Sequence, residues 1–177
     1  MLGALVLGVY AGGAQAQPVR WEAPGCPYSI EFPGEPTVEV VSAPGDPAIP
    51  DPSTPRLTNA TFVHPSGTFL VGCARSDNLL AQDAVRYTAL SHAANGRLIG
   101  LTEAPCTEIG GTTPLCATVE FQLVHEGQEI ARAISIVRAD GFYIFWVVVF
   151  ALGLPPDSPL TEVEQAFVGS VARKTVP

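Results

Sequence analysis

The chain has 177 residues, of which 47% are hydrophobic and 15% are charged, and its 17 acidic residues against nine basic ones give a net charge of −8. This composition excludes an intrinsically disordered chain, and the length suits one domain with its own core. The acidic balance, with Lys174 as the single lysine, also excludes the basic footprint that nucleic acids and anionic membrane surfaces require.

The first sixteen residues form a short apolar run that ends in small residues. Because Ala14-Gln15-Ala16 fits the small-x-small pattern of signal-peptidase cleavage, we predict a signal peptide at 1–16 and a single mature domain at 17–177. No Lys or Arg precedes the run, so either the signal is atypical or the true start lies upstream. The alternative is a buried N-terminal strand or helix, and the glycines disfavour the helix.

Cysteine usage indicates an oxidising compartment. An even count of four cysteines in an exported chain indicates two disulfides. We predict the pair Cys106–Cys116, since a loop with glycines and a proline between them can bring its ends together, and therefore Cys26–Cys73. Zinc binding is the rival interpretation, but it and a thioredoxin-like role are both disfavoured because the chain has no Cys-x-x-Cys pair.

Short strands are predicted at the start of the mature domain. Trp21 is expected to plug the edge of the core. Tyr28–Phe32 alternates apolar and polar residues as a half-buried strand does, Pro33–Pro36 ends it, and residues 37–42 form a short second strand. The next segment, 43–55, holds five prolines, which excludes a regular element and predicts an exposed loop. That loop is either plain surface or a docking segment for a proline-recognising partner.

A hairpin and a helix follow the proline-rich loop. Residues 56–64 and 68–75 are predicted to pair as two strands joined at Pro65-Ser66-Gly67. Apolar residues at helical spacing then predict a helix from Ser76 or Asp77 to about Ala94, and this helix would cover one face of the sheet. Residues 97–103 return as a strand.

The second half of the domain predicts an antiparallel meander of three strands, at 115–124, 129–138 and 141–152. The Asp140-Gly141 dipeptide between the last two is a strong hairpin signal. Residues 142–152 are all apolar or aromatic on both alternating sides, so we predict that this is the central strand of a sheet covered on both faces.

The last predicted element is an amphipathic helix around Phe167, capped by Ser158 or Thr161 and carrying Arg173 and Lys174 near its negative end. It would cover the second face of the meander. The predicted fold class is therefore α+β, with a mainly antiparallel sheet and helices covering both faces in an α/β/α sandwich.

No motif in the sequence points to catalysis. The three histidines, His64, His92 and His125, have no metal-ligand spacing partner and are expected to be exposed to solvent. The sequence has no Gly-x-Ser-x-Gly, no phosphate-cradling glycine loop and no His-Glu-x-x-His. Asp46 and Asp51 in the proline-rich loop could help to hold a weakly bound Ca²⁺. We predict no catalytic, cofactor-binding or metal-binding residues and no cofactor, and we do not expect an enzyme.

The chain resembles the PsbP-like group of small exported proteins, over most of residues 27–173. The resemblance lies in the order of the predicted elements and in the turn Phe32-Pro33-Gly34-Glu35-Pro36. It implies an α/β/α sandwich and a non-enzymatic accessory or binding module that docks on a larger assembly. No functional residue is carried over from the group, because no metal-binding motif matches.

The leading hypothesis is an exported, periplasmic or secreted, disulfide-bonded module that binds an unidentified protein partner in an envelope or periplasmic assembly. We expect no nucleic acid, no membrane span in the mature chain, and a monomer outside the complex. A small-ligand carrier is one alternative, and it requires a large apolar pocket between sheet and helix. A hydrolase is the other, and it requires a buried histidine beside an acid and a nucleophile in one pocket.

Overall fold

The computed structural model describes residues 17–41, 57–76, 78–104, 106, 114–152 and 158–174. The predicted signal peptide and the proline-rich loop lie outside the described residues, and so do Asp46 and Asp51.

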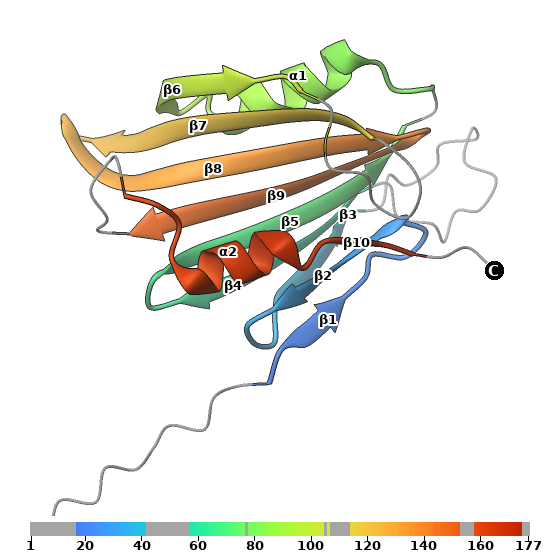
Figure 1. Ribbon diagram of the computed structural model, residues 1–177, viewed down its shortest axis with the longest axis horizontal. Helices are drawn as coiled ribbons and strands as arrows, with labels where there is room; N and C mark the ends of the chain where they lie inside the picture. Colours follow the sequence, from blue (N-terminus) through green and yellow to red (C-terminus); the bar gives the residue numbers. More distant parts are fainter. Residues whose placement is uncertain are drawn as a thin grey trace, which may run out of the picture.

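A seven-stranded sheet forms the body of the molecule (Figure 1). All neighbouring strands in it are antiparallel. From one edge to the other the strands are β3 (Thr37–Val41), β4 (Leu57–His64), β5 (Gly67–Arg75), β9 (Tyr143–Leu152), β8 (Gln128–Asp140), β7 (Leu115–His125) and β6 (Gly96–Thr102). The predicted hairpin and meander are therefore both present, and β9 joins them.

The prediction of a central strand is confirmed, because β9 lies between β5 and β8 in the middle of the sheet. Its alternate residues enter two separate buried clusters. Phe145, Val147 and Val149 lie on what we call the first face, and Ile144 and Val148 lie on the second face. An unbroken apolar run fits this position, since neither face of the strand meets water.

The first face is covered by a small sheet and one helix, which lie in front of the large sheet in Figure 1. The small sheet consists of β1 (Val19–Trp21), β2 (Tyr28–Phe32) and β10 (Ala172–Arg173), with β2 in the middle. The helix is α2 (Glu162–Gly169), and its buried Phe167 lies 4.7 Å from the ring of Phe69 on β5. Trp21 is buried in the same cluster, as the core-edge prediction required.

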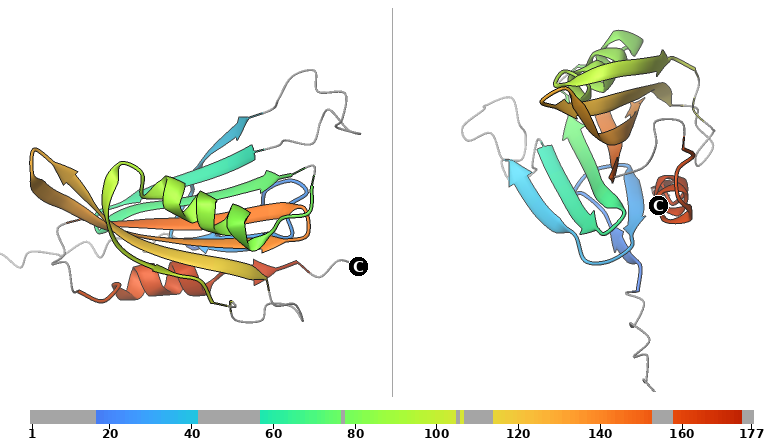
Figure 2. Two further views of the ribbon diagram at one scale, coloured as in Figure 1. Left: turned by 90° about the horizontal axis from the view of Figure 1, so that it is seen from above. Right: turned by 90° about the vertical axis from the view of Figure 1, so that its left-hand side faces the viewer.

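The second face is covered in part by helix α1 (Gln82–His92), which packs over β7 and β8 at the β6 end of the sheet (Figure 2). Its buried residues Val85 and Ala89 join Val119 and Val137 of those strands in one cluster. The small side chains of β8 on this face, such as Ala133, allow the helix to lie close to the sheet.

The predicted start of α1 at Ser76 or Asp77 is wrong. The helix begins at Gln82, after Ala81, and has no side-chain cap. The backbone N–H of Ser76 instead donates to the carbonyl oxygen of Phe142 at 2.7 Å, and that of Leu80 donates to Gly141 at 3.1 Å. In a helix capped by Ser76, the N–H of Leu80 would donate to the Ser76 carbonyl. Its hydrogen bond to Gly141, in the turn between β8 and β9, excludes that first turn.

The fold-class prediction is confirmed in its main part, an antiparallel sheet with two helices. The finer prediction, helices that cover both faces, is not confirmed, since much of the first face is covered by the small sheet. Within the described residues, no helix is both long enough and apolar enough to cross a membrane.

Candidate functional site

A cleft of about 750 Å³ opens on the first face, between α2, β2 and β4. Its volume falls within the range of roughly 300–1,000 Å³ that ligand sites occupy. Most of its lining is apolar, and His64, Glu31 and Ser170 are among its polar members. It is the candidate functional site because it combines concave shape, apolar walls and few polar groups.

Three phenylalanines from three different elements line the cleft. Phe32 ends β2, Phe62 lies on β4 and Phe167 lies on α2. The ring centroid of Phe32 is 5.0 Å from that of Phe167 and 6.4 Å from that of Phe62. Phe32 and Phe167 are fully packed, whereas Phe62 is half-buried and offers part of its ring to the cleft. Aromatic rings at such spacing form a rigid apolar surface.

His64 contributes the imidazole of the cleft. Its Nδ1 accepts a hydrogen bond from the backbone N–H of Ser66 at 3.2 Å and lies 2.8 Å from the Ser66 hydroxyl. Because Nδ1 is an acceptor, the neutral ring carries its proton on Nε2, which can then donate to an acceptor. The ring also packs against Phe62 and Phe69. The prediction of an exposed His64 is wrong, since these contacts leave the residue half-buried.

Helix α2 begins at a complete capping box. The backbone N–H of Thr161 donates to Glu164 Oε2 at 2.7 Å, and that of Glu164 donates to Thr161 Oγ1 at 3.4 Å. Thr161 is thus the cap, one of the two predicted residues. The box fixes the start of a helix of only eight residues, and three of them, Val163, Ala166 and Phe167, line the cleft.

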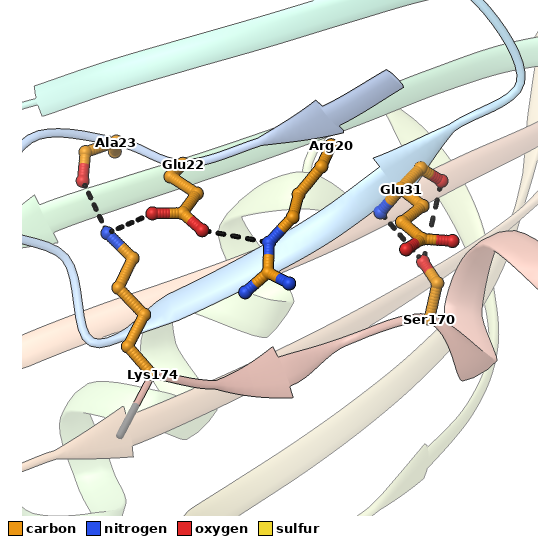
Figure 3. A network of polar contacts seen from close by, with 6 residues as sticks. All are labelled: Arg20, Glu22, Ala23, Glu31, Ser170 and Lys174. Atoms are coloured by element: carbon orange, nitrogen blue, oxygen red, sulfur yellow. Dashed lines mark hydrogen bonds and ion pairs between the residues drawn. The ribbon is translucent and has the colours of Figure 1, made fainter. Parts of the chain in front are cut away.

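Polar contacts tie the end of α2 to the small sheet (Figure 3). Ser170 Oγ accepts from the backbone N–H of Glu31 at 2.9 Å and donates to the Phe167 carbonyl at 2.7 Å. Both Glu31 and Ser170 lie at the cleft. The helix and β2 therefore hold a fixed separation at that side of the cleft.

Lys174 continues this connection beyond β10. Its Nζ lies 3.2 Å from a Glu22 carboxylate oxygen and 3.4 Å from the Ala23 carbonyl, and Arg20 Nε contacts the other Glu22 oxygen at 2.8 Å (Figure 3). The hydrogen bond from Lys174 is the main cause that lowers the pKa of Glu22 below its usual value. The predicted place of Lys174 at the end of α2 is wrong, because the helix ends at Gly169 and the following residues join the small sheet.

Comparison with known proteins bears on the fold. No family model matches the sequence, and no curated protein sequence matches it. The structure is similar to that of cyanobacterial PsbP (CyanoP) from Synechocystis sp. PCC 6803, with a TM-score of 0.59 and 12% identity, over 95% of this chain and 99% of that one. The protein has a PsbP-like fold.

Two further structures are less similar, with TM-scores below 0.5. One is a protein from Bacteroides thetaiotaomicron, with a TM-score of 0.47 and 14% identity over 92% of this chain and 50% of that one. The other is a protein of unknown function from Pseudomonas aeruginosa, with a TM-score of 0.36 and 9% identity over 78% and 85%. The similarity to cyanobacterial PsbP confirms the resemblance predicted from the sequence, at the level of the fold. The turn that suggested it contributes Phe32 and Pro33 to the cleft.

The four cysteines of this chain lie in the two predicted pairs, Cys26 with Cys73 and Cys106 with Cys116. The Cα atoms of Cys26 and Cys73 are 6.3 Å apart, and those of Cys106 and Cys116 are 5.4 Å apart. Both separations are disulfide distances. The first pair connects the segment before β2 to β5, and so links the small sheet to the large one. Two such pairs fit an extracellular or lumenal compartment.

The other two histidines of this chain, His92 and His125, do not line the cleft. His92 ends α1, where its Nδ1 lies 2.7 Å from the Ser135 hydroxyl, and burial lowers its pKa. The prediction that His92 is exposed is wrong, whereas His125 in its turn is exposed. Ser135 is 0% exposed, so a substrate cannot reach its hydroxyl. No described carboxylate is hydrogen-bonded to His92, so the imidazole has no acidic partner.

The described part of the chain also holds no group of three His, Cys, Asp or Glu residues placed to bind a metal ion.

The sequence did not predict the cleft. The alternation of β4 could have placed Phe62 and His64 on one face, but no local pattern brings α2 and β2 beside them.

Proposed function

We propose that the protein is an exported accessory module that docks on a larger envelope or periplasmic assembly by accepting an apolar segment of a protein partner in the cleft. The cleft of about 750 Å³ is the observation that carries the proposal. Its aromatic wall is held in place by the capping box of α2 and by the Ser170 contacts. One apolar side chain fully buried there contributes about 1.5–3 kcal/mol to binding.

Two further observations support the proposal: the cysteine pairs, which bear on the compartment, and the fold. The apolar leader and the two cysteine pairs at disulfide distance favour a periplasmic or secreted location, because disulfides persist in oxidising compartments. The PsbP-like fold favours an accessory role by analogy alone, since a fold does not determine a function. We infer a monomer outside the assembly.

Native co-purification tests the proposal. The C-terminally tagged protein is expressed at its natural level, the envelope is extracted gently, and eluted proteins are identified by mass spectrometry. Ala166 is an exposed residue of α2 that lines the cleft, so Ala166→Trp places an indole in the partner's space. Ala94 is exposed after α1, so Ala94→Trp is the matched control. We expect a stoichiometric partner with the wild type and with Ala94→Trp, and its loss with Ala166→Trp.

A partner that Ala166→Trp retains would show that docking does not use the cleft. No partner at all from the wild type would count against an accessory role. That result would favour the second candidate function, a small-ligand carrier, because the cleft is the apolar space between sheet and helix that such a carrier requires. Native mass spectrometry separates the two: a carrier elutes with a small molecule that Ala166→Trp releases.

A further inference from the structure

Strand β3 forms one edge of the large sheet, at its outer side in Figure 2, and its side chains are exposed on both faces. Residues 37–40 are all exposed. Val38 lies opposite Ala60 and Val40 opposite Thr58, on the first face, and the two valines are 48% and 51% exposed. An edge strand with exposed β-branched side chains is a surface on which another strand can pair.

The register of β4 shows that Val38 and Val40 direct their backbone groups away from the sheet. His64 and Gly67 are the pair that closes the hairpin of β4 and β5 around two residues, so they exchange both hydrogen bonds. Because hydrogen-bonded and non-hydrogen-bonded pairs alternate, the odd-numbered residues of β4 bond to β3 instead, and the residues of β3 opposite them are also the odd-numbered ones. The N–H and C=O groups of Val38 and Val40 therefore point outward, where the described part of the chain places no further strand.

Strand β6 is the other edge of the sheet and is less regular. Its pairing with β7 shifts register between Leu98 and Gly100, and a bulge of this kind protects a sheet edge from further pairing. Strand β3 keeps one register with β4 through all five of its residues. It is therefore the edge that offers a regular template for an added strand.

Charge determines which strand fits β3. An added antiparallel strand would place one residue opposite Glu39 in a non-hydrogen-bonded pair, where opposing side chains approach most closely. A second copy of β3, paired about its middle residue, would bring its own Glu39 to this carboxylate, and like charges directly opposite are destabilising. The net charge of −8 adds to the repulsion between copies. A Lys or Arg opposite Glu39 is attracted instead, with apolar residues opposite Val38 and Val40.

We propose that β3 adds an extended segment of the protein partner, with an apolar–basic–apolar pattern, to the large sheet. The proposal rests on the proposed function only in assigning this segment to the same partner that enters the cleft. Phe62 in the cleft lies on β4 two residues from Ala60, on the same face, and Ala60 is the neighbour of Val38 in register. One partner chain can therefore contact the cleft and pair with β3 without crossing to the other face of the sheet.

Backbone amide NMR of the full mature domain tests strand addition with two probes, acetyl-Ser-Thr-Val-Lys-Val-Thr-Ser-amide and the same peptide with Glu in place of Lys. We expect the Lys peptide to shift the amide signals of Val38 and Val40, and to bind with a Kd about fivefold lower than that of the Glu peptide at low ionic strength. Glu39→Lys should reverse this preference. Val40→Pro removes an outward N–H without removing a bond to β4, so the domain should keep its fold and lose the binding of both peptides.

Glu129→Lys is the matched control, because it makes the same charge change on an exposed residue of β8, and it should keep the preference for the Lys peptide. Ala166→Trp, which fills the cleft, should leave the titration unchanged, so the result on β3 is read separately from docking in the cleft. Equal affinity for the two peptides, binding retained by Val40→Pro, or no binding at all would overturn the proposal. A concentration-dependent dimer of the wild type that Val40→Pro abolishes would also overturn it, because a second copy would then occupy this edge.

Discussion

The indole ring of Trp146 lies directly over Gly72, its neighbour in register on the adjoining strand β5. A Cβ atom at position 72 would occupy the space of the indole ring. Glycine is therefore the residue that lets Trp146 lie flat on the second face, where the ring also packs 5.8 Å from His92. This contact connects the centre of the large sheet to the end of α1.

Replacing this glycine should destabilise the domain. Gly72→Ala forces the indole or the strand to move, and overpacking of this kind costs about 1–3 kcal/mol. Urea unfolding of the two proteins measures the difference in the free energy of unfolding. Gly100→Ala is the control, because a Cβ at Gly100 on β6 meets nothing within 4 Å, and it should stay close to wild type. Equal losses in both variants would refute the role of the indole contact.

The half-buried His92 predicts a pH dependence of stability. Burial lowers its pKa, so the folded state binds the proton less well than the unfolded state, whose histidine titrates near 6.5. The stability that this group contributes is complete above about pH 6.5 and is lost as the pH falls through the lower folded value. Urea unfolding at pH 7.5 and 5.5 should show a smaller loss for His92→Gln than for the wild type. The same loss in both proteins would exclude His92 as the source.

The two cysteine pairs should contribute unequally to stability. Sequence separations of 47 and 10 residues for Cys26–Cys73 and Cys106–Cys116 correspond, in the chain-entropy description, to about 4 and about 3 kcal/mol. Peptide mapping without reductant first checks the pairing. Double Cys→Ala variants then give the two losses by urea unfolding, with the larger one expected for the buried Cys26 and Cys73. A Cys26–Cys106 peptide, or free thiols, would contradict the pairing.

The capping box of α2 should stabilise the helix that lines one side of the cleft. Thr161→Ala removes the side-chain acceptor of the capping box and should destabilise the domain by about 1 kcal/mol. Thr102→Ala, at an exposed strand end, is the control and should change little. Hydrogen exchange of residues 162–169 should rise with Thr161→Ala and stay unchanged with Thr102→Ala. Unchanged exchange in both would mean that packing of Phe167 alone holds the helix.

Local pattern predicted the parts of the fold in which one segment determines its own environment. The run after Gly141 has no polar side, so it had to be covered on both faces, and β9 is central. The Asp140-Gly141 turn likewise appeared where predicted, with Gly141 at a φ of 61°. Thr161 with Glu164 three residues later is a local capping signature, and it fixed the start of α2.

Local pattern failed where distant segments decide the outcome. The start of α1 depends on hydrogen bonds to Gly141 and Phe142, about sixty residues further along the chain. The small sheet joins residues 19–21 and 28–32 to the two residues of β10, which are too few to carry a periodic signal. The cleft combines those segments with α2 and β4, so neither its shape nor the position of His64 in its lining was predictable from spacing.

The position of β9 has a consequence for biosynthesis. Strands β3–β5 and β6–β8 form two separate groups, and the sheet joins them only through β9, which ends at Leu152 of 177 residues. A growing polypeptide on the ribosome cannot close this sheet until most of the chain has been synthesised. The two strand groups therefore stay apart until β9 has left the ribosome, so the closed sheet forms late in synthesis.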